Sequence, residues 1–167
     1  MLLSESARVT TAQEARFRIQ YPNSKPRAVK VIALDAEAAR LVDDISKQQW
    51  NGAAFFKSLS FEHSGEANAK AWLNDLAGHT SELASEVAHA DCVVVIAGAG
   101  EDAASVSVIA ELCTQYHKTL VALVVPQGSY DQDTVDRSLK ALRPYAKMLV
   151  IAHERDYIDA MLTALRA

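Results

Sequence analysis

The sequence predicts an α/β fold: a three-layer, doubly wound, Rossmann-like sandwich around a mostly parallel five-stranded sheet. Two observations predict it. Short apolar runs alternate along the chain with segments whose apolar residues recur at helical spacing, which is the order typical of α/β proteins. Four of these runs are almost continuously apolar, which indicates burial on both faces, as in a parallel sheet covered by helices. Right-handed crossovers between such strands give the doubly wound topology.

The expected strands are apolar and most are rich in β-branched residues, and they cover residues 28–34, 51–61, 92–98, 118–125 and 147–152. Helices are expected after each strand, and after the second strand a loop comes first. In the first, Ala38, Leu41, Val42 and Ile45 recur at helical spacing and would face the sheet. This pattern accounts for most of the chain between residue 28 and the last residue.

Two regions depart from the alternation. Residues 1–27 are polar and contain two prolines, and we expect them to form an N-terminal arm before a single domain at residues 28–167. Residues 62–90 are expected to hold a loop and then one or two helices, the last capped by Thr80 or Ser81. Trp72 is expected on a helix in this region and, like Trp50, packed in the core.

Composition excludes several classes of function. The chain has 167 residues, of which 50% are hydrophobic and 23% charged, with a net charge of −4, so it is neither disordered nor suited to nucleic acid. No apolar run approaches the roughly 18 residues that cross a membrane, and the N-terminus turns polar too soon for a signal peptide. Cys92 and Cys113 fall at apolar positions and are expected to be buried free thiols. We therefore expect a cytoplasmic protein without a membrane span.

Ligands of parallel sheets bind at the carboxyl ends of the strands. Acidic residues occupy these places here: Asp35 follows the first strand, and Glu101 and Asp102 come directly after Gly98 and Gly100. No GxxxxGK[ST] or GxGxxG motif is present, and an incoming phosphate would meet several negative charges. The carboxylates could cap helices or bind Mg²⁺, for which Asp35 and Asp102 are the weak candidates.

His153 follows the last strand and could act as an acid or base at the carboxyl ends of the strands. The five histidines of the chain are scattered, however, and there is no CxxC pair, so a zinc site is not expected. No cofactor is expected either. The residues alone do not assemble a catalytic set.

The chain also resembles a known family over residues 28–160. The quoted stretches are "KVIALDAEAARLV" (30–42), "ADCVVVIAGAGEDAASVSVIAEL" (90–112), "TLVALVVPQGSY" (119–130) and "LRPYAKMLVIAHERDYI" (142–158). In order and wording they resemble the nucleotide-binding domain of the FtsZ family of tubulin-like GTPases. The glycine-rich loops of that family are largely replaced here, and its second half has no counterpart.

The resemblance implies that Gly98 and Gly100 stand at phosphate-loop positions and that Pro126 belongs to a stretch lining the nucleotide pocket. It implies a degenerate tubulin-like domain that works through a protein partner or as a homo-oligomer. Two alternatives stay open. One is a small-molecule or metal-dependent enzyme using Asp35, Glu101 and Asp102, and the other is a residual nucleotide-binding protein.

Overall fold

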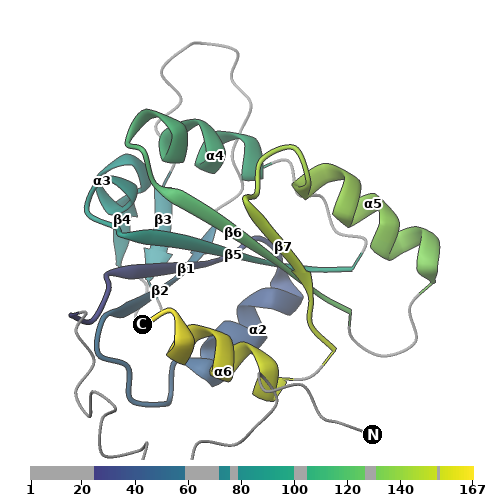
Figure 1. Ribbon diagram of the computed structural model, residues 1–167, viewed down its shortest axis with the longest axis horizontal. Coiled ribbons are helices and arrows are strands. Elements are labelled where there is room, and N and C mark those ends of the chain that lie inside the picture. The colour runs from purple at the N-terminus through teal and green to yellow at the C-terminus, as the bar shows by residue number, and fades with distance from the viewer. Residues whose placement is uncertain (1–24, 59–71, 76–78, 100–104, 127–130, 154) are drawn as a thin grey trace, which may run out of the picture.

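The computed structural model describes residues 25–58, 72–75, 79–99, 105–126, 131–153 and 155–167. They form an α/β domain with one seven-stranded, mostly parallel sheet (Figure 1). The expected arm at residues 1–27 lies almost wholly outside these residues. In chain order the elements are β1 (Val29–Ala33), α2 (Ala36–Ile45), β2 (Ala53–Ser58), β3 (Trp72–Asp75), β4 (Thr80–Glu82), α3 (Leu83–Ala88), β5 (Cys92–Gly98), α4 (Ser105–Gln115), β6 (Thr119–Val125), α5 (Gln132–Leu142), β7 (Met148–Ile151) and α6 (Arg155–Ala164).

The sheet has the strand order β4-β3-β2-β1-β5-β6-β7. The neighbouring strands β2, β1, β5, β6 and β7 pair in parallel, whereas β3 pairs antiparallel with both β2 and β4. The five parallel strands therefore follow the order 2-1-3-4-5, the order of flavodoxin-like sheets rather than the 3-2-1-4-5-6 order of the dinucleotide-binding Rossmann fold. In the flavodoxin-like order the topological switch point lies between β1 and β5.

The sheet has two more strands than the five expected from the sequence. Strands β3 and β4 form a hairpin in the segment where a loop and helices were expected, so Trp72 is on a strand and Thr80 and Ser81 are not helix caps. The Asp75 N–H donates to the His79 carbonyl at 2.9 Å, and the Asp75 carboxylate accepts the His79 N–H at 2.8 Å. The hairpin forms because β2 offers a free edge, which local sequence does not reveal.

Two apolar layers cover the two faces of the sheet. Helices α3, α4 and α5 pack on one face, and α2 and α6 pack on the other (Figure 1). Strand β5 is buried at all seven positions and supplies side chains to both layers. The near-continuous apolar runs are thus explained by burial on both faces, as expected.

Lys30, a charged residue of the central strand β1, forms an ion pair on the face of the sheet that α3, α4 and α5 cover. The Lys30 ammonium of β1 lies 2.8 Å from the Glu86 carboxylate of α3, and 5.6 Å from the centre of the Phe56 ring. Both charged side chains are largely buried. The ion pair therefore connects helix α3 to the middle of the sheet without leaving an unpaired charge there.

Two helices end at a residue in the left-handed conformation. After α4, His117 has a φ of 55°, and the next N–H donates to the Cys113 carbonyl at 2.7 Å. After α6, Arg166 has a φ of 66°, and the Ala167 N–H donates to the Leu162 carbonyl at 3.1 Å. Both ends match the Schellman motif, in which glycine is the usual residue.

The described helices include none that is long and apolar enough to cross a membrane.

Gly52, just before β2, is packed against the start of β1. A Cβ atom there would overlap the carbonyl oxygen of Arg27, while the Gly52 carbonyl accepts the Val29 N–H at 3.0 Å. We predict that Gly52→Ala lowers the free energy of unfolding by about 2 kcal/mol, because backbone rather than a flexible side chain has to move. Urea unfolding would measure it. The matched control is Asn51→Ala at the exposed neighbouring position, and an equal effect of both substitutions would contradict the explanation.

The two cysteines are buried on opposite faces of the sheet and are not joined. Burial raises the pKa of the Cys113 thiol to about 11, and burial likewise raises the pKa of Cys92. We predict that both thiols of the native protein react slowly with Ellman's reagent at mildly alkaline pH, because the thiolate of Cys113 is about a hundredfold scarcer than normal. Labelling in urea should be fast for both, whereas a fast native thiol would disprove the prediction.

Candidate functional site at the carboxyl ends of the strands

Asp35 lies at the topological switch point, between the end of β1 and the start of α2. Its backbone is extended, with φ −142° and ψ 175°, and its carboxylate accepts the Ala38 N–H at 2.8 Å as the N-cap of α2. The second carboxylate oxygen accepts the Gly98 N–H at 2.5 Å, at the end of β5. One side chain thus joins the first turn of a helix to the end of a strand 63 residues further along the chain.

Gly98 is held from a second direction by α5. The hydroxyl of Ser138, which is 2% exposed, lies 3.5 Å from the Gly98 carbonyl oxygen and 3.4 Å from the Thr134 carbonyl. A Cβ atom on Gly98 would lie 3.0 Å from a Glu37 carboxylate oxygen and 3.2 Å from an Asp35 oxygen. The absence of a side chain at Gly98 therefore lets the two carboxylates approach the strand end.

This arrangement decides what the crevice can bind. An anion would need free N–H groups at the strand end and the helix N-terminus. The Gly98 and Ala38 N–H groups already donate to Asp35, and the carboxylates of Asp35 and Glu37 add two negative charges. In the part of the chain that the structure describes, no group of three or more His, Cys, Asp or Glu side chains could hold a metal ion. The described part of the crevice is occupied by the protein's own carboxylate.

The sequence-predicted site residues fall into three groups. Asp35 and Gly98 are in direct contact. Pro126 is buried just after β6, and His153 is exposed two residues beyond β7. Both therefore also lie at the carboxyl ends of the strands, but after strands other than β1 and β5. Gly100, Glu101 and Asp102 lie outside the described residues, and with them the suggested Asp35–Asp102 metal pair.

Sequence reasoning missed Ser138. Its position on α5, three residues after Val135 and four before Leu142, places a hydroxyl on the apolar face of the helix. A polar residue at an inward position was the signal that could have identified it. Its hydroxyl lies within reach of two carbonyl oxygens to which it can donate its one proton, which explains how it is accommodated in the core.

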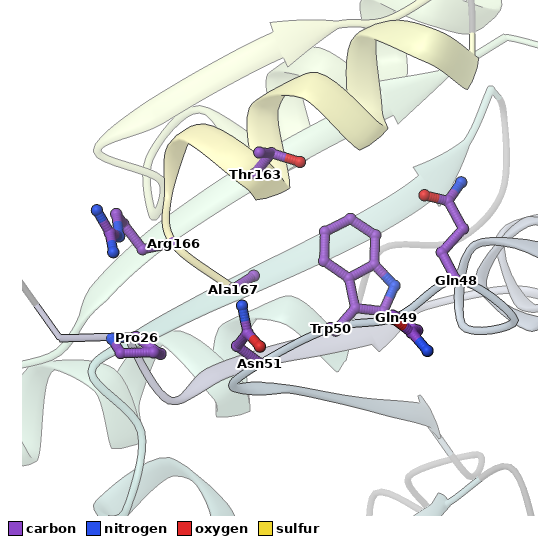
Figure 2. A pocket seen from close by; sticks show the side chains of 8 residues that line it. All are labelled: Pro26, Gln48, Gln49, Trp50, Asn51, Thr163, Arg166 and Ala167. Carbon is purple, nitrogen blue, oxygen red and sulfur yellow. The ribbon is translucent and has the colours of Figure 1, made fainter. Parts of the chain in front are cut away.

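A separate groove of about 330 Å³ lies at the opposite side of the domain, near the amino ends of β1 and β2 (Figure 2). Its lining comes from the segment before β1, the connection from α2 to β2 and the end of α6: Pro26, Gln48, Gln49, Trp50, Asn51, Thr163, Arg166 and Ala167. In Figure 2 the Trp50 indole and the Arg166 guanidinium lie at opposite ends of it. The indole N–H donates to the Ile45 carbonyl at 3.0 Å, and its ring lies 6.1 Å from that of Phe55. Trp50 is thus partly buried against the core, and the groove contains none of the expected site residues.

Comparison with known proteins does not assign the chain to a family. No family model and no curated protein matches the chain. Among solved structures it is similar to a protein from Burkholderia pseudomallei K96243 that is described as pilus assembly-related, with 17% identity and a TM-score of 0.41. That similarity covers 88% of this chain and 95% of the other. No family model supports the FtsZ resemblance.

Substitution of Asp35 should show how much the closed crevice contributes to stability. We predict that Asp35→Ala lowers the free energy of unfolding by about 2–3 kcal/mol, because an N-cap and a charge-assisted hydrogen bond are both lost. Asp35→Asn should lose about half as much, since an amide offers one oxygen for the two N–H groups. Chemical denaturation of the two variants measures the difference.

The matched control is Glu37→Gln, which removes the neighbouring negative charge but none of the two hydrogen bonds to Asp35. It should leave stability nearly unchanged. If Asp35→Asn is as stable as the unsubstituted protein, the carboxylate does not hold the strand end in the way described.

Proposed function

We propose that the chain is a non-catalytic α/β domain that acts by associating with protein. The observation that carries the proposal is the contact between the Asp35 carboxylate and the Gly98 N–H at 2.5 Å. In a flavodoxin-like sheet a ligand binds at this switch point. Here two of the described donors at that point, the Ala38 and Gly98 N–H groups, are bonded to the protein's own side chain. A domain that keeps the sheet but closes its ligand crevice retains its outer surfaces for function.

The same proposal has a narrower form, a tubulin-like domain that has lost its GTPase chemistry. Its support is the sequence resemblance, together with the engagement of Gly98, which that resemblance places in a phosphate loop. The strand order weighs against it, because the five parallel strands follow the flavodoxin-like order. We therefore adopt the general form, in which association does not depend on tubulin ancestry.

A thermal-shift titration tests the proposal directly. The full chain is heated with GTP, GDP, ATP or Mg²⁺, alone and combined. A ligand at 100 times its dissociation constant would stabilise the fold by about 2.7 kcal/mol, which is readily seen in a domain of this size. We predict no shift with any of them, because the described anion donors are occupied and the carboxylates repel phosphate.

Asp35→Ala identifies the site if a shift does occur. Removing this carboxylate should strengthen binding of a nucleotide at the crevice and weaken binding of Mg²⁺ there. A shift with nucleotide would replace the proposal with a residual nucleotide-binding function, and a shift with Mg²⁺ alone would replace it with a metal-dependent one.

A further inference from the structure

The two edges of the sheet differ in how well they are protected against pairing with another strand. At one edge, β4 has only three residues, all polar, with the sequence Thr-Ser-Glu. At the other edge, β7 has the sequence Met-Leu-Val-Ile, without a charge, a proline or a glycine. Short, polar strands are a common protection of sheet edges, whereas an uncharged apolar edge is a ready template for a further strand.

Large apolar side chains are exposed around the β7 edge. Four of the five large hydrophobic residues exposed in the described chain lie on this strand or close to it: Tyr145 at 43%, Met148 at 39%, Ile151 at 38% and Tyr157 at 48%. The inward side chains, Leu149 and Val150, pack on opposite layers of the core. The strand is therefore anchored on both faces while its end residues Met148 and Ile151 are exposed, and Tyr and Met are enriched at protein interfaces.

The charges that flank β7 are opposite at its two ends. Lys147 immediately precedes the strand, Asp156 lies five residues after it in the first turn of α6, and both side chains are exposed. Neither forms an ion pair within the described residues. Arg155, by contrast, donates to the Asp44 carbonyl at 2.8 Å and so is directed toward α2. The edge thus has a positive end and a negative end on either side of an apolar centre.

We propose that β7 pairs with β7 of a second copy of this chain, antiparallel and about a two-fold axis, to form one continuous sheet across the dimer. The antiparallel arrangement places the Lys147 end of each strand beside the Asp156 end of the other, so that opposite charges meet twice by symmetry. Apolar side chains meet at the centre, where interfaces exclude charge. A second copy satisfies this pattern without any further assumption about the partner.

This inference rests on the proposed association function and gives it a surface and a partner. Sedimentation equilibrium of the full chain over a range of concentrations tests it. We expect a concentration-dependent dimer. Ile151→Lys should weaken dimerisation about tenfold or more, because it places a charge among the apolar side chains of the paired strands. The matched control, Thr80→Lys at the exposed β4 edge, should leave the dissociation constant unchanged.

A charge swap tests the antiparallel arrangement. Lys147→Glu and Asp156→Lys, each alone, should weaken the dimer a few-fold, as expected for exposed ion pairs, and the double variant should recover it. Both positions are exposed, so these variants test the interface even if Ile151→Lys fails to fold, which circular dichroism would show.

Three results would overturn the inference: a monomer at every concentration, a dimer that Ile151→Lys leaves intact, or equal effects at the two edges. These results are independent of the nucleotide titration. A monomer that binds neither nucleotide nor Mg²⁺ would disprove the pairing but leave association with another protein standing. A ligand-induced shift would disprove the proposed function even if the chain dimerises.

Discussion

The carboxylate of Asp35 is the interaction on which the arrangement of this sheet end depends. Where a parallel strand ends, some backbone groups have no partner in the sheet. A helix likewise begins with N–H groups that have no partner in the helix. A bound anion often satisfies both. Here one side chain accepts from the first turn of α2 and from the end of β5, so these two described donors are satisfied without a ligand. Ser138 supports Gly98 from the other side.

The occupied donors at the switch point direct attention from the strand ends to the edge strands as candidate binding surfaces. In an open sheet the strand ends bind small molecules and the edges are usually protected. In the described part of this domain, the Gly98 N–H at the switch point bonds to the Asp35 carboxylate, and one of the two edge strands is apolar and uncharged. The groove near the amino ends of β1 and β2 and the end of α6 includes neither the switch point nor the β7 edge. These two features are the support for the proposal that the domain binds protein.

The sequence predicted the elements whose pattern is set by burial. Strands β1, β5 and β6 are apolar because both faces are covered, and that condition is visible in the residues. The β3–β4 hairpin was not predictable, since its stability comes from pairing with β2, a partner distant in sequence. At the site, Asp35 and Gly98 were identified individually by their positions after strands. Their hydrogen bond depends on the β1–β5 pairing, and the role of Ser138 depends on how α5 packs.

The Lys30–Glu86 ion pair has a consequence for how the strands align. Side chains of β1 alternate between the two layers, with Val29 and Val31 under α2 and α6 and Lys30 facing α3. If β1 slipped by one residue, every side chain would change face, and the ammonium would enter the apolar layer without its carboxylate. Valine and isoleucine could exchange places at little cost, but a lysine could not. The charge in the middle of the sheet thus disfavours any alignment of the central strands that is shifted by one residue.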